Sequence, residues 1–401
     1  MSQLLRNRFQ SYRDPQDLME YNRYPFFRMI ESEQGTEVIV KGKKVLMFGS
    51  NSYLGLTTHP KIKEAAEAAV RKYGSSCAGS RFLNGTSNLH VELEERLADF
   101  FNKEAALLFS TGFQVNLGII PTITTKKDII ILDRLNHASI LEAAKLSSAP
   151  SVVYRHNDMR SLEQKLKHSQ DADMRLIVVD GVFSMEGDIA KLPEIVALAK
   201  KYNAVVMSDC AHAVGVIGKN GAGTASHFGL DDDISIIGGT FSKSFASLGG
   251  FAAADKDTIN YVKHNARSLI FSAAPTPASI AAATAALDIM ESDDSLRLKL
   301  LDSTRYSIDR LNELGFDTGD TQTPIIPIYI RDNIKTYDLT MKLLERGVFV
   351  NPVVAPAVAP EDSLIRFSLM ATHTRDQIDF AIDAIYEIAK ELNINLSYKA
   401  A

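Results

Sequence analysis

One lysine follows the end of an apolar run that predicts a buried strand. The segment GGTFSKSFASLGG starts at Gly238, inside the end of the run ISIIGG, and places Lys243 three residues after Thr240. Burying an amine costs several kcal/mol unless its charge is paired or its pKa falls. Lys243 is therefore either a solvated loop residue or an amine held in place for covalent chemistry.

Other reactive side chains follow further apolar runs along the chain. LIVVD ends at Asp180, AVVMSD ends at Asp209 with His212 three residues later, and IIIL leads into DRLNHAS with His137. AALLF runs into Ser-Thr-Gly-Phe (110–113), which opens a predicted helix. In open α/β sheets, ligands bind at the carboxyl ends of the strands. These segments therefore predict one shared crevice.

Each of these residues also has a purely structural interpretation. Asp209 alone could cap a helix or stabilise a turn, and His137 could lie in a capped first turn. The set as a whole suits pyridoxal 5'-phosphate (PLP), which needs a lysine amine, a carboxylate beside its pyridine nitrogen and a phosphate cup. Lys243 and Asp209 supply the first two, His137 can stack on the ring, and His212 can reach its phenolic oxygen. The turn at 110–113 offers helix N–H groups to a phosphate.

Competing motifs are not supported by the residues present. A P-loop needs glycine just before its lysine, where this chain has Ser242, and GVIGKNGAGT does not fit the dinucleotide fingerprint. The nine histidines show no metal-binding spacing, so we expect no metal site.

Alternating strands and helices are predicted over the first two thirds of the chain. The expected strands are 105–109, 129–132, 152–155, 176–180, 204–209, 234–239 and 250–254. Segments with 3.6-residue periodicity separate most of them, as in HVELEERLADFF from His90 and LPEIVALAKKY from Leu192. Strands that are apolar on both faces indicate a mostly parallel sheet, here of seven strands, between two layers of helices.

The pattern changes after about residue 276. A long helical stretch leads to IIPIYI (325–330), a second helical segment and a final helix DQIDFAIDAIYEIAKEL. EVIVKGKKVLMFG (37–49) predicts a hairpin with Gly42 near its turn. We therefore predict an N-terminal arm and hairpin at 1–50, a large α/β domain at 51–275 and a smaller α+β domain at 276–401.

Composition restricts the class of protein. The 401 residues carry a formal net charge of −5 and no long basic block, which argues against a nucleic-acid partner. The first residues contain no apolar signal-peptide core, and no run approaches the ~18 apolar residues of a spanning helix. Two cysteines without a CxxC pattern suit a reducing compartment. The sequence thus predicts a cytoplasmic globular protein.

Ordered motifs across nearly the whole chain resemble the α-oxoamine synthase family of PLP-dependent fold-type I enzymes. The resemblance rests on these segments: NSYLGL (51–56), CAGSRFLNGT (77–86), ELEERLADF (92–100), STGFQVN (110–116), DRLNHASI (133–140), DGVFSMEGD (180–188), DCAH (209–212), GTFSKS (239–244), FSAAPTP (271–277) and IRFSLMATHT (365–374). One departure is Cys210, where the family usually has an acidic residue. Since Cys210 lies beside Asp209 rather than in its place, it leaves the expected site intact.

The resemblance implies roles for further residues. The phosphate ligands would be Gly112, Phe113, Thr240 and Ser242, and Ser184 would lie near the cofactor's phenolic oxygen. Ser272 matches a residue that reaches the phosphate of the partner subunit, so a homodimer would share its active sites. Arg366 would pair with the substrate carboxylate, as a bidentate guanidinium can. Asn51 and Arg81 would lie at the substrate mouth, and His137 would also contact the substrate.

Substrates follow from the resemblance too. GTFSKS with LGGF, GSRFLNGT and the NPVVAPAVAPEDSLIRFSL region are most similar to bacterial members that condense L-serine with a long-chain acyl-CoA. Glycine C-acetyltransferase and 8-amino-7-oxononanoate synthase, which use glycine or alanine, are the nearer alternative, although they more often carry glycine where this chain has Ser242. A non-catalytic subunit is the more distant one, and it would be expected to lack Lys243. The N-terminal 35 residues are either an arm across the dimer or a weak peripheral contact with the inner membrane.

Overall fold

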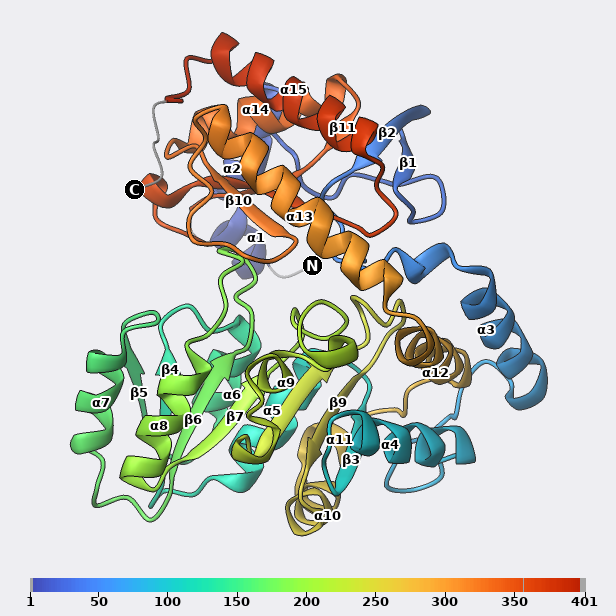
Figure 1. The fold of residues 1–401 in the computed structure, drawn as a ribbon, viewed down its shortest axis with the longest axis vertical. Coiled ribbons are helices and arrows are strands. Elements are labelled where there is room, and N and C mark those ends of the chain that lie inside the picture. Colours follow the sequence, from blue (N-terminus) through green and yellow to red (C-terminus); the bar gives the residue numbers. More distant parts are fainter. Residues whose placement is uncertain (1–2, 356, 397–401) are drawn as a thin grey trace.

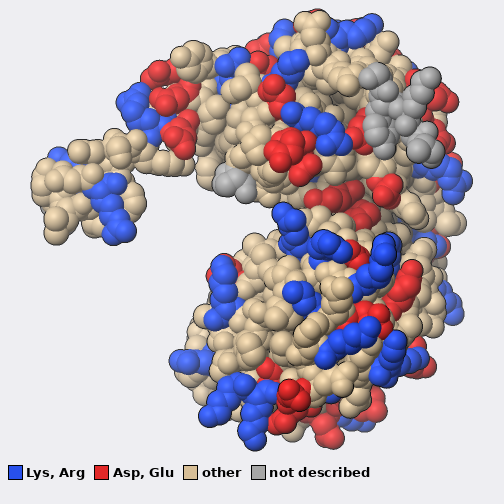
Figure 2. Space-filling model, turned by 90° about the vertical axis from the view of Figure 1, so that its left-hand side faces the viewer, with Lys and Arg blue, Asp and Glu red and all other residues tan. Residues whose placement is uncertain are grey.

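The computed structural model describes residues 3–355 and 357–396. Figure 1 shows a lower lobe around one large sheet and an upper lobe that contains the C-terminal helices and the N-terminal hairpin. A side view shows a deep hollow between the two lobes (Figure 2).

The lower lobe is built on seven strands in the order β3-β9-β8-β7-β6-β4-β5. Their bounds are β3 (Ala105–Phe109), β4 (Ile129–Asp133), β5 (Ser151–Tyr154), β6 (Arg175–Asp180), β7 (Val205–Asp209), β8 (Ile236–Thr240) and β9 (Gly250–Ala254). Only β9 runs antiparallel, to both of its neighbours. The predicted mostly parallel sheet of seven strands is therefore confirmed.

Both faces of this sheet are covered by helices, which explains why its strands are apolar throughout. Within β6, Ile177 and Val179 join one core cluster, while Leu176 and Val178 join the other, as the two-residue period of a strand requires. The first face packs against α4 (Asn88–Phe100), α7 (Met159–Lys167) and α8 (Leu192–Tyr202). The second packs against α5 (Gly112–Ile123), α6 (Ala138–Leu146), α10 (Lys256–Asn265) and α11 (Arg267–Ile270).

The upper lobe has its own small sheet, in the antiparallel order β10-β13-β12. Its strands are β10 (Ile325–Tyr329), β12 (Asn351–Val353) and β13 (Leu364–Ser368), and its helices are α13 (Ser295–Glu313), α14 (Asn333–Glu345) and α15 (Arg375–Glu391). α15 starts with a capping box between Thr374 and Gln377. The small sheet brings β13, and with it Arg366, to face the large lobe.

The predicted hairpin joins the upper lobe. β1 (Glu37–Val40) and β2 (Lys43–Met47) are linked by Lys41 and Gly42, whose φ angles of 51° and 71° suit a type I′ turn. β2 also pairs in parallel with β11 (Val348–Phe349). Contacts thus cross both predicted domain limits, since α12 (Pro277–Ser292) also packs against α3 (Pro60–Tyr73). The division at residues 50 and 275 stays a prediction.

An N-terminal arm projects from the body on the left of Figure 2. Its helices, α1 (Gln3–Phe9) and α2 (Asp14–Glu20), have no buried residue. The arm is attached at its base, where Arg23 pairs with Asp338 at 2.6 Å and the Arg28 guanidinium lies 3.5 Å from the centre of the Phe349 ring. No helix in the described part of the chain is long and apolar enough to cross a membrane.

A buried ion pair ties the loop at 77–86 to the large lobe. Arg81 donates to both carboxylate oxygens of Glu94 in α4, at 2.8 and 3.0 Å, and its Nε donates to Thr86. Glu94 also accepts from the backbone N–H of Leu108 in β3. The side chains of Arg81 and Glu94 are only 4% and 11% exposed. One carboxylate therefore connects a loop, a helix and a strand.

A second ion-pair cluster holds the loop that follows β6. His156, just after β5, bonds Asp133 at the end of β4 and Asp188 in the loop, each at 2.9 Å. Burial alone would lower the pKa of His156, but the hydrogen bonds and charges of the two carboxylates raise it to about 10. The ring thus stays protonated at neutral pH and fixes the loop that carries Ser184.

We expect Arg81→Met to destabilise the protein strongly. Removing one member of a buried ion pair leaves the other charged and unpaired, which costs about 3–5 kcal/mol. Arg96→Met is the matched control, because Arg96 pairs with Asp288 on a half-exposed surface where such pairs contribute at most about 1 kcal/mol. Thermal unfolding of both variants gives the comparison. Equal midpoints for the two variants would contradict a stabilising role of the Arg81–Glu94 pair.

His156→Gln should lower stability in a pH-dependent way. The pKa of His156 rises from about 6.5 in the unfolded chain to about 10 in the folded protein. Protonated His156 therefore contributes fully to the free energy of unfolding at pH values below about 6.5. That contribution is lost as the pH rises through the higher pKa value. The deficit of the variant in unfolding midpoint should therefore be largest near pH 6 and shrink toward pH 10. A deficit that is constant over this range would show that His156 acts through packing alone.

Candidate active site

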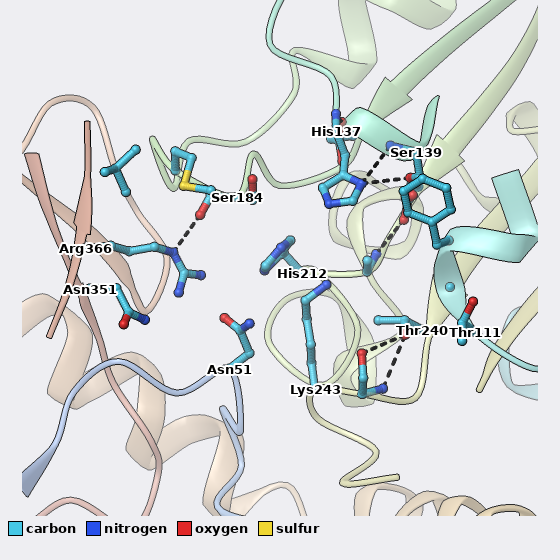
Figure 3. A pocket seen from close by; sticks show the side chains of 18 of the residues that line it. Asn51, Thr111, His137, Ser139, Ser184, His212, Thr240, Lys243, Asn351 and Arg366 are labelled. Atoms are coloured by element: carbon cyan, nitrogen blue, oxygen red, sulfur yellow. Dashed lines mark hydrogen bonds between the residues drawn. The ribbon is translucent and has the colours of Figure 1, made fainter. Parts of the chain in front are cut away.

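The strand ends of the large sheet and the upper lobe enclose a cavity of about 580 Å³. Figure 3 shows its side chains converging from both lobes. The lining residues are Asn51, Thr111, Gly112, Phe113, His137, Ser139, Asp180, Ser184, Met185, Asp209, Ala211, His212, Thr240, Ser242, Lys243, Leu248, Asn351, Pro352, Val353 and Arg366. Five of the seven strands of the large sheet, β3, β4, β6, β7 and β8, deliver residues to this cavity within four positions of their ends.

Lys243 lies at the centre of the cavity, with its amine pointing toward the two histidines (Figure 3). Its amine has no hydrogen-bond partner among the described residues. Burial lowers the pKa of Lys243 to about 8; the charge of Asp209 opposes this shift, and that of Arg366 adds to it. A substantial fraction of the amine is therefore neutral near physiological pH, which is the form that acts as a nucleophile.

Asp209 faces the cavity from the end of β7. Its Oδ2 accepts from the side-chain amide of Asn116 at 2.7 Å, and its Oδ1 accepts from the N–H of Ala211 at 3.0 Å. Asn116 also donates to Ser139 at 2.9 Å, so the amide is held from both sides. This fixed carboxylate can accept a further hydrogen bond from a protonated ring nitrogen in the cavity.

Both cavity histidines have a lowered pKa, which favours the neutral form of the ring at neutral pH. Burial lowers the pKa of His137, and it lowers the pKa of His212 well below the usual value, with the charge of Lys243 as a second cause. The Nδ1 of His137 accepts from the backbone N–H of Ser139 at 3.2 Å, which leaves the proton on Nε2, directed into the cavity. The backbone N–H of His137 donates to Asp180 at 2.7 Å and fixes the start of α6.

One end of the cavity is suited to a phosphate group. Gly112 is the first residue of α5, where free N–H groups attract anions, and the Thr240 and Ser242 hydroxyls lie 2.9 Å apart beside it. Any side chain at Gly112 would place its Cβ only 2.6 Å from the Cβ of Thr240. The residues thus form a close-fitting cup of backbone and hydroxyl groups, and they fit the phosphate that PLP carries.

Arg366 faces the cavity from β13. It donates from Nε to the carbonyl of Ser184 at 2.7 Å, from one terminal nitrogen to Ser368 at 2.8 Å, and from the other to Tyr53 at 3.1 Å. Three of its five N–H bonds are used by these described residues. One N–H remains on each terminal nitrogen, which matches the two oxygens of a carboxylate.

Two residues named from the resemblance lie outside this cavity. The resemblance places Arg81 at the substrate mouth, whereas the structure buries it against Glu94, with no polar group directed at the cavity of its own chain. Ser272 accepts from the side-chain amide of Gln114 at 3.0 Å and does not line the cavity. The other expected residues, from Asn51 to Arg366, all line it.

The structure adds residues for which the sequence predicted no role, although Asp180 was among the strand-end residues of the predicted crevice. Asp180 lines the cavity at the end of β6, and burial followed by the charge of Asp209 raises its pKa well above the usual value. Its place at a strand end was a signal comparable to that of Asp209. Asn116 lies four residues after Gly112 on α5, hence on the same helix face. Tyr53 lies in a loop, where the residue types give no such signal.

Comparisons with known proteins place the chain in a family. Residues 43–385 match the family Aminotransferase class I and II. The chain is 54% identical over 390 residues to the serine palmitoyltransferase of Sphingobacterium spiritivorum, covering 97% of this chain and 98% of that protein. It is 45% identical to the 8-amino-7-oxononanoate synthase 1 of Bacillus velezensis, covering 94% and 97%.

A solved structure agrees with these relatives. A variant of the serine palmitoyltransferase from S. paucimobilis, with a bound PLP–myriocin aldimine, superposes with a TM-score of 0.94 at 34% identity, covering 97% of this chain and 99% of that one. The chain therefore belongs to the aminotransferase class I and II family and, within its PLP-dependent fold type I, to the α-oxoamine synthases.

Proposed function

We propose that the chain is a PLP-dependent acyltransferase that condenses L-serine with palmitoyl-CoA or another long-chain acyl-CoA. The products would be 3-ketosphinganine, coenzyme A and carbon dioxide, in the first step of sphingolipid biosynthesis. The observation that carries the proposal is the half-buried amine of Lys243, unpaired and with a pKa lowered to about 8, in a cavity shared with Asp209, His137 and His212. Relatives named serine palmitoyltransferase, at 51–54% identity, select this reaction among those that such a site supports.

Each part of PLP has a matching group in the cavity. Lys243 would bind its aldehyde, Asp209 would keep its pyridine nitrogen protonated, and Gly112 with Phe113, Thr240 and Ser242 would hold its phosphate. His137 would lie on the face of its ring, with His212 and Ser184 near its phenolic oxygen. When bound, PLP supplies an electron sink for the electron pair left at the amino acid's Cα.

The chain's own residues bind and orient the amino acid. Arg366 would take its carboxylate through the two N–H bonds that remain free, with Asn51 beside it. The Nε2–H of His137 would also contact this carboxylate and help retain it until the acyl group has been added. Lys243, once released, would remove the Cα proton, a task suited to an amine with a pKa of about 8.

The acyl transfer and the decarboxylation that follow need no reactant besides the amino acid and the acyl-CoA. A carbon–carbon bond forms between Cα and the thioester carbonyl as coenzyme A leaves as a thiolate; carbon dioxide is then lost, and Cα regains a proton. Phe113, Met185, Leu248 and Val353 give part of the cavity an apolar lining. Such a surface supports an acyl chain as the second substrate.

An α-oxoamine synthase that takes glycine or alanine is the second candidate. The 45% identity to an 8-amino-7-oxononanoate synthase favours it, because the cofactor site would serve both reactions equally well. The two candidates differ in the amino acid and in the length of the acyl chain.

Assembly and location form part of the same proposal. We expect a homodimer whose sites are shared, with no nucleic-acid partner. We also expect a cytoplasmic enzyme, because acyl-CoA is available there, and the N-terminal arm is the candidate for a weak contact with the inner membrane.

The product of serine and palmitoyl-CoA should be 3-ketosphinganine, identified by mass spectrometry. Serine should be turned over at least tenfold faster than glycine or alanine, which corresponds to about 1.4 kcal/mol of transition-state preference. Lys243→Ala should abolish both turnover and the visible absorbance of the lysine-bound cofactor. Preference for glycine or alanine with short acyl-CoAs would select the second candidate, and a Lys243→Ala variant that keeps both signals would refute the role of Lys243.

Mixing two inactive variants tests the shared site. If Ser272 serves the partner's phosphate cup, mixing Lys243→Ala with Ser272→Asp restores one intact site in each heterodimer, since lysine and serine then come from different chains. Random pairing should give about a quarter of wild-type activity. Lys243→Ala mixed with Arg366→Ala is the control, expected to show no rescue because both residues serve one chain's cavity. Proven heterodimers of the first mixture without activity would refute the shared site.

A further inference from the structure

Tyr53 links two functional groups of the cavity from behind. It is completely buried and does not line the cavity, yet its hydroxyl lies 2.6 Å from Nδ1 of His212 and 3.1 Å from a terminal nitrogen of Arg366. The backbone of Tyr53 is also fixed, because its N–H donates to the carbonyl of Asn51 and its carbonyl accepts from the N–H of Ala371. The hydroxyl therefore has a fixed place between a ring and a guanidinium that belong to different lobes.

The direction of these hydrogen bonds follows from chemistry. A guanidinium can only donate, so the oxygen of Tyr53 accepts from Arg366. The proton of Tyr53 must then point elsewhere, and Nδ1 of His212 at 2.6 Å is much closer than the side-chain oxygen of Asn51 at 3.4 Å. Because buried His212 is neutral, its Nδ1 is free to accept this proton. The proton of the imidazole is thereby confined to Nε2.

We infer that Tyr53 is a positioning residue that fixes His212 as an Nε2–H donor and couples it to the carboxylate-binding Arg366. This inference deepens the proposed function and rests on it, since Arg366 and His212 would contact the amino acid and PLP respectively. A carboxylate bound to Arg366 polarises the guanidinium, and Tyr53 is the described residue that passes this change directly to His212.

Tyr53→Phe removes the hydroxyl and leaves the ring. Arg366 then loses one of its three fixed partners and His212 loses the partner of Nδ1. Two signals should change in the PLP-loaded enzyme. The Kd for L-serine, measured by spectral titration, should rise about three- to tenfold, the usual value of one hydrogen bond. The pH midpoint of the cofactor's visible band, measured without substrate, should also shift.

Two control variants separate this coupling from simple structural damage. Ser368→Ala removes a different partner of Arg366, at 2.8 Å, and should raise the Kd for serine while leaving the pH midpoint unchanged. Tyr337→Phe removes the hydroxyl of a tyrosine that is only 9% exposed and makes no hydrogen bond to a described residue, and it should change neither signal. In a His212→Leu background, Tyr53→Phe should no longer shift the midpoint.

The inference is overturned if Tyr53→Phe lowers only the unfolding temperature and leaves the Kd for serine and the pH midpoint of the visible band at their wild-type values. It is also overturned if the midpoint shift persists in the His212→Leu background, since the shift would then not pass through His212. Failure of the proposed function looks different, because the wild-type enzyme would then form no 3-ketosphinganine. If glycine or alanine proves to be the substrate, the same titrations apply, because each carries the carboxylate that Arg366 binds.

Discussion

The amine of Lys243 has to stay unpaired in a half-buried position, and much of the cavity is arranged around that constraint. A buried lysine tends to lose its proton, and here the pKa falls only to about 8 because Asp209 opposes the effect of burial. A direct ion pair with Asp209 would have held the amine charged and unreactive. Instead, Asp209 is held by Asn116 and the N–H of Ala211, so its charge acts on Lys243 without a hydrogen bond between them.

The loops that complete the cavity depend on buried charge as much as on the sheet. His156 holds the loop after β6 through Asp188, and that loop presents the carbonyl of Ser184 to Arg366. The orientation of an arginine in the upper lobe is thus fixed by a histidine at the end of β5. The charges of His156 and Asp188 would be costly to bury without each other, so their ion pair favours the one loop conformation in which they meet. Such fixed arrangements are what a preorganised site needs.

Sequence reasoning succeeded where the fold itself places residues. The ends of parallel strands must meet at one edge, so Asp209, His137 and Lys243 could be brought together from the order of apolar runs alone. It failed where partners are decided by packing between distant segments. Arg81 and Glu94 are thirteen residues apart, and no pattern indicates that they pair with each other rather than with substrate or solvent. Tyr53 contacts Arg366 across 313 positions of sequence, and only the closure of the two lobes creates that contact.

Asp180 and Asp209, at neighbouring strand ends, show how packing gives two identical carboxyl groups different surroundings. Asp180 and Asp209 are register partners in β6 and β7, and two like charges so close cannot both ionise without cost. Asp209 receives two donors, from Asn116 and Ala211, while Asp180 receives one, from the N–H of His137. Burial and the charge of Asp209 accordingly raise the pKa of Asp180 well above its usual value. The two donors hold Asp209 in one orientation, from which its oxygens can accept a hydrogen bond from a cationic ring.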